Sequence, residues 1–363
     1  MSEINTVLGT IDTRKMGFTL CHEHVLSAFS GVYRNYPQLL DKGNLLDKAV
    51  AELSQAKAGG VNTIVDATTL DLGREPELMA EASHRSGVNI IATTGWWLDI
   101  PRQSAGISAD QYADQFVREI EDGIAGTKIK AGVLKSASDI GGVRPLEAIV
   151  LRGTARAHKR TGVPIMLHSY PVGQVGKQQI AILLEEGVDL HHVKIDHCND
   201  TTDVEYLIWL LEQGCFLGMD RSSGIVSPRA RIKTLKALID AGYADRLCPS
   251  HDRLSLYIKG DIDPGTEELK KWWKLQGMAY LKNIIFPQLR DLGVRENIIK
   301  ALTKKEDMDR VVEEWRNAWK RHGFLYIKNV VLAKLGEMGV PGTVIKTLCV
   351  DGPRIFFEGK VEK

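Results

Sequence analysis

The order of apolar and amphipathic segments along the chain is the feature that most constrains its fold. Eight short apolar runs, rich in β-branched residues, cover 17–24, 61–67, 88–94, 129–135, 163–168, 192–197, 215–220 and 246–251. Stretches with helical spacing separate them, at 44–58, 75–86, 109–124, 146–160, 174–186, 201–213 and 228–241. Most of these stretches end at a glycine, which is a common helix stop signal. Strands that alternate with helices are expected to pair in parallel.

Eight strands of this kind predict an α/β fold, with a closed (β/α)₈ TIM barrel as the simplest architecture. The chain has 363 residues, of which 44% are hydrophobic, and this suits one barrel domain with an addition. An open doubly wound sheet is the alternative. The chain has no GxGxxG after the first run, which disfavours a dinucleotide-binding version of that sheet.

The segment after the eighth run is helical and contains an internal repeat. Residues 278–302 align with residues 324–348 at an offset of 46, which indicates a partial duplication. Since only one copy can form the last helix of a barrel, the other copy is extra. We therefore predict one domain, 1–363, with a helical insertion at about 255–322.

Charge and cysteine content exclude several classes of partner. Lys and Arg number 47 against 46 Asp and Glu, which gives a net charge of +1, so neither nucleic acid nor a membrane surface is expected as a partner. The chain also lacks an apolar run long enough for a transmembrane helix. Its five cysteines form no CxxC pair, which favours reduced thiols in the cytoplasm.

A pair of histidines ends the first apolar run, in the sequence His22-Glu23-His24. Alternate residues of a strand share a face, so the two imidazoles point the same way and can bind one cation. On that alternation Phe18 and Leu20 share their face, whereas Cys21 points towards the helices. An HxH pair is also found as ordinary strand residues, so the pair alone decides nothing.

Other runs also end in a polar residue that shares the face of the inward apolar residues. His168 follows Pro164 and Met166, and His197 follows Val193 and Ile195. Asp252 and Lys135 close the eighth and fourth runs in the same way. Four imidazoles and a carboxylate therefore converge at the mouth of the barrel. Such ligands suit Zn²⁺, Mn²⁺, Co²⁺ or Fe²⁺.

Lys135 is the unusual member of this set, because an ammonium group beside two cations would be repelled. A neutral amine could react with CO₂ to form a carbamate, whose two oxygens can bridge two metals, and buried lysines lose their proton readily. Alternatively, Lys135 forms a hydrogen bond with a neighbouring carboxylate. The spacing of the residues leaves both interpretations open.

Six motifs together resemble the phosphotriesterase-like family of the amidohydrolase superfamily, which includes phosphotriesterases and phosphotriesterase-like lactonases. They are VLGTIDTRKMGFTLCHEHV, AGVLKSAS, VPIMLHS, IDHCNDTTD, LGMDR and PSHD, and the resemblance covers about residues 6–256 and 324–357. It implies two divalent metal ions, with Zn²⁺ as the first expectation. His22, His24 and Asp252 would bind one ion and His168 and His197 the other, while a carbamate on Lys135 would bridge them. It also implies a homodimer.

The expected activity is hydrolysis by a hydroxide that bridges the two metals and attacks a carbonyl or phosphoryl centre. Asp252 would accept the proton. We expect a small, neutral, apolar substrate: a lactone, such as an acyl-homoserine lactone, or another ester, with phosphotriesters as secondary substrates. The alternatives are an aryldialkylphosphatase-type phosphotriesterase as the main activity, and an inactive barrel that serves as a binding protein.

Four further residues are candidates for contact with the substrate. Trp96 and Trp97 follow the third run, Arg221 follows the seventh, and Tyr257 follows the eighth. Lactone-hydrolysing members of the family have an arginine in the Asp-Arg context of Arg221. Each candidate also has a structural interpretation: the tryptophans could pack against helices, Arg221 could form a salt bridge with Asp220 or another acid, and Tyr257 could anchor a helix.

Overall fold

Parallel strands surrounded by helices form the core of the computed structural model, which describes residues 3–28, 30–31, 35, 42–221, 226–252, 254–256, 317 and 321–359. Within these residues the main sheet has the order β10-β9-β8-β7-β6-β5-β4-β3-β11, and every neighbouring pair is parallel. The strands are β3 (Thr19–Ser27), β4 (Thr63–Asp66), β5 (Asn89–Gly95), β6 (Val133–Ala137), β7 (Ile165–His168), β8 (Val193–Ile195), β9 (Phe216–Met219), β10 (Leu247–Pro249) and β11 (Leu254–Leu256).

The eighth barrel strand is split into two parts, and this split closes the sheet. Its first half, β10, pairs with β9, whereas its second half, β11, pairs with β3. Between the halves, the backbone N–H of Asp252 donates to the carbonyl of His22 at 3.1 Å. The predicted (β/α)₈ barrel is therefore confirmed, and barrel strand extends to residue 256, just inside the range where we expected the helical insertion to begin.

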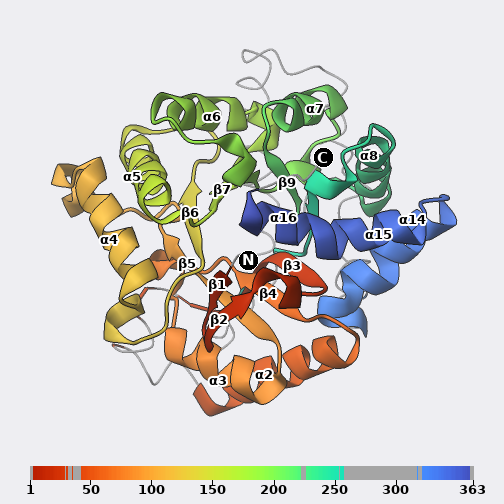
Figure 1. Ribbon diagram of the computed structural model, residues 1–363, viewed down its shortest axis with the longest axis horizontal. Helices are drawn as coiled ribbons and strands as arrows, with labels where there is room; N and C mark the ends of the chain where they lie inside the picture. Colours follow the sequence, from red (N-terminus) through yellow and green to blue (C-terminus); the bar gives the residue numbers. More distant parts are fainter. Residues whose placement is uncertain are drawn as a thin grey trace, which may run out of the picture.

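Seven helices follow the strands and surround the barrel (Figure 1). They are α2 (Lys42–Ala58), α3 (Pro76–Ser86), α4 (Ala109–Glu121), α5 (Pro145–Thr161), α6 (Gly176–Glu185), α7 (Val204–Glu212) and α8 (Pro228–Asp240). Proline at the first position begins α3 and α5, and a left-handed glycine, Gly87 or Gly162, ends each of them. The bounds lie within a few residues of those predicted.

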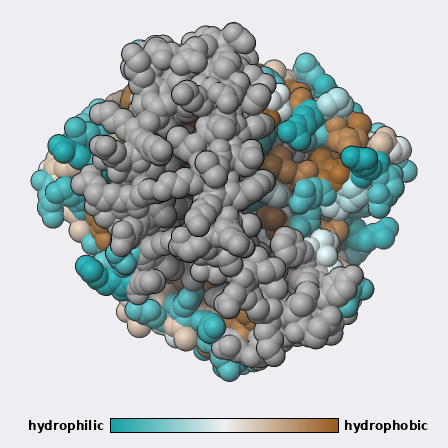
Figure 2. Space-filling view, turned by 180° about the vertical axis from the view of Figure 1, so that it is seen from behind, coloured by the Kyte–Doolittle hydropathy of each residue, from teal (hydrophilic) through white to brown (hydrophobic). Residues whose placement is uncertain are grey.

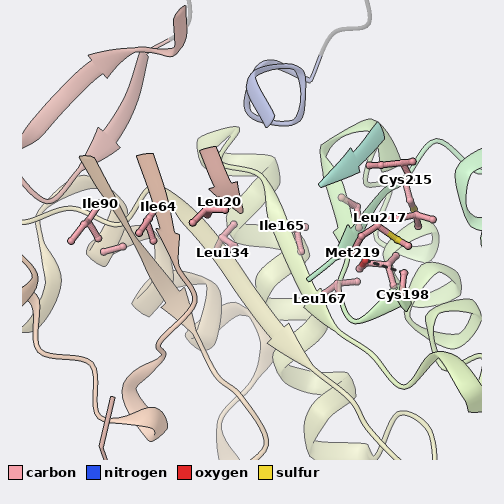
Figure 3. Close-up of a cluster of buried hydrophobic side chains, with 14 of the residues drawn as sticks. Leu20, Ile64, Ile90, Leu134, Ile165, Leu167, Cys198, Cys215, Leu217 and Met219 are labelled. Carbon is pink, nitrogen blue, oxygen red and sulfur yellow. Dashed lines mark hydrogen bonds between the residues drawn. The ribbon is translucent and has the colours of Figure 1, made fainter. Parts of the chain in front are cut away.

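The strands present apolar side chains on both faces. The outward face packs against the helices and includes Leu20, Ile64, Ile90, Leu134 and Ile165 (Figure 3). The inward face fills the barrel with a second cluster, which comprises Ile4, Met16, Cys21, Val65, Ala67, Ile91, Val133, Met166, Phe216, Cys248, Phe356 and Phe357. Both faces are apolar because a parallel barrel is covered by helices outside and packed inside.

Two of the predicted strand alternations are wrong. Leu20 packs outward and Cys21 lies inside the barrel, because the register of β3 against β4 shifts between Leu20 and Glu23. Such a bulge changes which face the following residues point to, so the alternation cannot be extrapolated from His22 back to Leu20 and Cys21. On β8, Val193 and Ile195 also pack outward, so the inward residue of that strand is Lys194.

Elements from both ends of the chain close the bottom of the barrel, at the amino ends of the strands (Figure 1). A hairpin of β1 (Glu3–Thr6) and β2 (Gly9–Asp12), which was not predicted from the sequence, lies beside β5. Its Asn5 side chain donates to the carbonyl of Ala131 at 3.0 Å. Helix α16 (Gly352–Glu358) contributes Phe356 to the barrel interior. The mouth at the opposite end is therefore where a site can form.

The second copy of the internal repeat packs on the barrel. It forms η12 (Gly323–Leu325), η13 (Ile327–Leu332), α14 (Ala333–Glu337), α15 (Gly342–Lys346) and η14 (Thr347–Asp351). Phe324, Ile327 and Leu335 are buried in the same cluster as the barrel helices, so this copy supplies the last helical layer. The first copy, 278–302, lies outside the described residues. None of the helices described is long and apolar enough to cross a membrane.

Candidate metal centre

The six predicted metal ligands lie together at the carboxyl ends of the barrel strands. Figure 2 views the molecule from this side, with a rim of mixed hydrophilic and hydrophobic residues around the grey atoms. The ligands come from β3, β6 and β7, from the residues after β8, and from the break between β10 and β11. They are His22, His24, Lys135, His168, His197 and Asp252, and all but Asp252 are buried. Separate strands thus bring residues that are far apart in sequence to one place.

His22, His24 and Asp252 form the first group. The Nε2 atoms of His22 and His24 lie 3.3 and 3.4 Å from the same Asp252 oxygen, Oδ1. One ligand atom from each residue lies within 4.8 Å of the others, close enough for all three to hold one ion. The hydroxyl of Thr68 contacts Nδ1 of His24 at 2.8 Å, which leaves Nε2 of that ring for a metal.

His168 and His197 form the second group. Nδ1 of His168 lies 2.8 Å from Nε2 of His197, so the two rings face one another edge on. Behind His168, Nε2 lies 3.5 Å from a carboxylate oxygen of Asp139. A carboxylate in that position fixes the ring of a metal-binding histidine. The two rings are therefore arranged to share one ion.

Regular strand alternation does not explain why His197 and Asp252 face the centre. Both have left-handed backbone conformations, with φ of 64° and 51°. This conformation is uncommon for residues other than glycine and is often found at functional sites. Since β8 presents Lys194 inward, a regular strand would turn His197 away from the centre. His197 therefore lies at the predicted centre, although the alternation from which it was predicted is wrong.

Lys135 lies between the two groups. Its side chain is 1% exposed, and Nζ lies 3.4 Å from Nε2 of His22 and donates to the carbonyl of Ala67 at 3.1 Å. Burial lowers the pKa of Lys135 to about 8, although the charge of Asp252 opposes the shift. A substantial fraction of the amine is therefore neutral near pH 8, and neutral amine is the form that reacts with CO₂.

The electrostatics of the group fit a divalent cation. Burial lowers the pKa of His24, His168 and His197, which favours the neutral imidazole that can donate a lone pair to a metal. Burial alone would raise the pKa of Asp252, but the imidazoles of His197 and His22 hold it well below its usual value.

Sequence reasoning missed the acids that surround these ligands. Asp220, at the end of β9, accepts from the backbone N–H of His197 at 2.8 Å and contacts its Nδ1 at 3.0 Å. Asp196 and Asp139 contact His22 and His168 in a similar way. The available signal was the position of Asp196 and Asp220 at the ends of the apolar runs 192–197 and 215–220. In the sequence-based prediction, Asp220 is only a possible partner of Arg221.

Arg221 and Trp97 lie beside the ligands. Arg221 donates from Nε to Asp252 at 3.0 Å and from Nη1 to Asp200 at 2.8 Å, and its side chain is 30% exposed. It forms salt bridges with these two acids rather than with Asp220. Nε1 of Trp97 lies 3.3 Å from Nδ1 of His168. Arg221 and Trp97 therefore lie where a substrate at the mouth could touch them.

Trp96 and Tyr257 complete the predicted set of substrate contacts. Trp96 is only partly buried and packs against the helix-side core, which is the structural alternative given above. Tyr257 lies outside the described residues, so its position stays a prediction.

Comparison with known proteins agrees with this arrangement. A sequence model of the Phosphotriesterase family matches residues 2–307. The chain belongs to this family. A phosphotriesterase homology protein of Mycobacterium tuberculosis is 38% identical over 314 residues, which cover 83% of this chain and 95% of that protein. An aryldialkylphosphatase of Saccharolobus solfataricus is 34% identical over 301 residues, 82% of this chain and 95% of that protein.

More distant members of the phosphotriesterase family have a different named activity. An N-acetyltaurine hydrolase of Xenopus tropicalis is 29% identical over 345 residues, 83% of this chain and 95% of that protein. The family and these relatives point to a metal-dependent hydrolase, and the described His and Asp groups could bind the metal. The family alone does not decide which bond is cleaved.

Proposed function

We propose that this phosphotriesterase-family chain is a binuclear metal-dependent hydrolase that cleaves lactones and related apolar esters. The observation that supports this most directly is the convergence of four buried imidazoles, Lys135 and Asp252 at the barrel mouth. Their donor chemistry suits Zn²⁺, with Mn²⁺, Co²⁺ and Fe²⁺ as alternatives. The pKa of about 8 for Lys135 supports the carbamate that would bridge the two ions.

Two bound cations would supply a water of lowered pKa and a positive charge that polarises the substrate. The protein residues would transfer the proton and contact the substrate. Asp252 lies close to both groups of predicted ligands, which supports its assignment as the acceptor of the proton from that water. Arg221, which donates to Asp252, would orient the carboxylate and meet the substrate oxygen from its exposed side. Trp97 would form part of the apolar wall.

Relatives favour two other substrate classes. The 34% identity to an aryldialkylphosphatase supports phosphotriesters as the main or a secondary substrate. The match to an N-acetyltaurine hydrolase adds an amide to the candidates. A barrel that binds a ligand without catalysis is the remaining alternative, and the complete set of six ligands argues against it.

A metal titration and a substrate screen together test the proposal. We expect about two equivalents of divalent metal per chain by elemental analysis, and hydrolysis of at least one apolar lactone in the holoenzyme. The screen should include acyl-homoserine lactones, phosphotriesters, carboxylic esters and N-acetyltaurine. Protein that contains no metal after purification from metal-replete medium would favour the binding-protein alternative.

A further inference from the structure

A buried charge pair lies in the barrel interior directly beneath the metal ligands. Lys194 on β8 and Asp196, two residues later, both point inward because alternate strand residues share a face. Both side chains are 0% exposed, and the ammonium group of Lys194 donates to Oδ1 of Asp196. The reaction proposed above uses neither residue. A fully buried ion pair is costly to form, so its position calls for a reason.

The other oxygen of Asp196 faces a metal ligand. Oδ2 of Asp196 lies 3.0 Å from Nδ1 of His22, and Oδ2 of Asp220 lies 3.1 Å from the same nitrogen. On the opposite edge of the ring, Nε2 of His22 points to Asp252 and Lys135. The two carboxylates therefore flank the Nδ1 edge of His22 and leave the Nε2 edge for a metal.

Two carboxylates this close require a positive charge. A Cβ atom on Gly218 would lie 2.3 Å from Oδ2 of Asp220 and 2.5 Å from Oδ1 of Asp196, so the two acids meet in the space that this glycine leaves. His22 has only one Nδ1 proton to share between them. Like charges in a dry interior disfavour each other's ionised form, and the Lys194 ammonium offsets one of them.

We propose that Lys194 and Asp196 position the metal centre: Lys194 keeps Asp196 in place, and Asp196 holds His22 with Nε2 directed at the ion shared with His24 and Asp252. The inference rests on the proposed function, since it assigns a task within that site. The contrasting explanation is an ion pair that contributes only to barrel stability. Loss of a carboxylate behind a ligating histidine typically lowers metal affinity by about 10–100-fold.

The double substitution Lys194→Met/Asp196→Leu separates the two explanations. Replacing a buried ion pair with apolar residues of similar volume often leaves stability unchanged or increases it. We therefore expect the metal-free variant to unfold at a temperature close to that of the metal-free wild type. Its affinity for one of the two Zn²⁺ ions, measured by competition with a chelating dye, should fall about 10–100-fold.

The exposed pair of Lys236 and Asp240 on α8 provides a matched control, because Lys236→Met/Asp240→Leu removes the same groups far from the mouth. This control should bind Zn²⁺ like the wild type. If Lys194→Met/Asp196→Leu does not fold, Lys194→Met/Asp196→Asn removes the charges and keeps the shape, and it should also bind Zn²⁺ more weakly.

Wild-type affinity for Zn²⁺ in a folded variant would overturn the positioning role and leave the proposed function intact. Wild-type protein that binds no divalent ion would overturn the proposed function, and the positioning role with it. The two failures are therefore distinguishable.

Discussion

Asp252 is the residue that we propose both binds a metal and accepts a proton. In Asp252→Asn, the amide keeps one oxygen for a metal but cannot accept a proton. We expect the variant to retain most of its metal and to lose about 10²–10⁴-fold in kcat, the usual effect of removing a general base. Elemental analysis and steady-state kinetics on the same sample test this. Near-normal turnover at full metal occupancy would show that another group moves the proton.

Lys135 supplies the expected bridge. Lys135→Ala should abolish the two-metal site, because both carbamate oxygens are lost at once. Short carboxylic acids added to the variant should restore part of the activity by taking the place of the carbamate, which a merely destabilised variant would not show. An active holoenzyme whose electron density contains an unmodified amine far from any metal would contradict the bridging role.

The lowered pKa of Lys135 gives a pH dependence for assembly of the site. With a pKa of about 8, the neutral amine is the minor form at pH 7 and the major form at pH 9. At a fixed concentration of dissolved CO₂, the rate at which metal-free protein becomes active on addition of Zn²⁺ and CO₂ should rise about tenfold between pH 7 and pH 9. A rate that falls or stays constant over this interval would argue against carbamate formation.

At the scale of elements, Glu23 connects the first strand, the eighth strand and the terminal helical layer. Its Oε1 accepts from the Ser250 hydroxyl at 2.6 Å and from Nδ1 of His251 at 2.6 Å. Nε2 of His251 in turn accepts from the backbone N–H of Ile327 at 3.2 Å, at the start of η13. The residue between the two ligand histidines thus closes the barrel from its outer face.

Removing this link should destabilise the barrel. Glu23→Ala leaves several buried donors without their acceptor, so we expect the free energy of unfolding to fall by about 3–5 kcal/mol, measured by chemical denaturation of the metal-free protein. Glu337→Ala breaks an exposed pair with Lys334 and should change stability by less than about 0.5 kcal/mol. A loss for Glu23→Ala as small as this control would mean that the link contributes little.

For the whole molecule, the predicted insertion and the homodimer remain to be tested. The last described strand, β11, ends at Leu256, and in such folds the loops that follow the strands at this end are the substrate loops. Replacing 258–320 with a short flexible linker distinguishes two roles. A lid predicts a dimer with broader substrate specificity and altered KM, whereas a dimer interface predicts a monomer or aggregate by light scattering. Unchanged specificity and assembly would exclude both.

Periodicity in the sequence was sufficient to predict the architecture, and together with the family resemblance it identified the predicted metal ligands that the structure brings together. Apolar runs and glycine stops depend on local backbone preferences and on burial, so β3 to β10 and α2 to α8 could be located without tertiary information. Polar residues that end apolar runs, such as His168 and Lys135, are visible for the same reason. The hairpin of β1 and β2 was missed because its strands are largely polar, so they form no apolar run.

Tertiary structure alone decided how the ligands are oriented and what holds them. The bulge in β3 and the left-handed backbones of His197 and Asp252 depend on contacts with neighbouring strands, so strand alternation assigned Cys21 and Val193 to the wrong faces. The contact of Asp196, which pairs with Lys194, with His22 likewise joins residues of different strands. Sequence spacing shows which residues share a strand face only where the strand is regular. The predicted ligands are oriented at places where the strands are irregular.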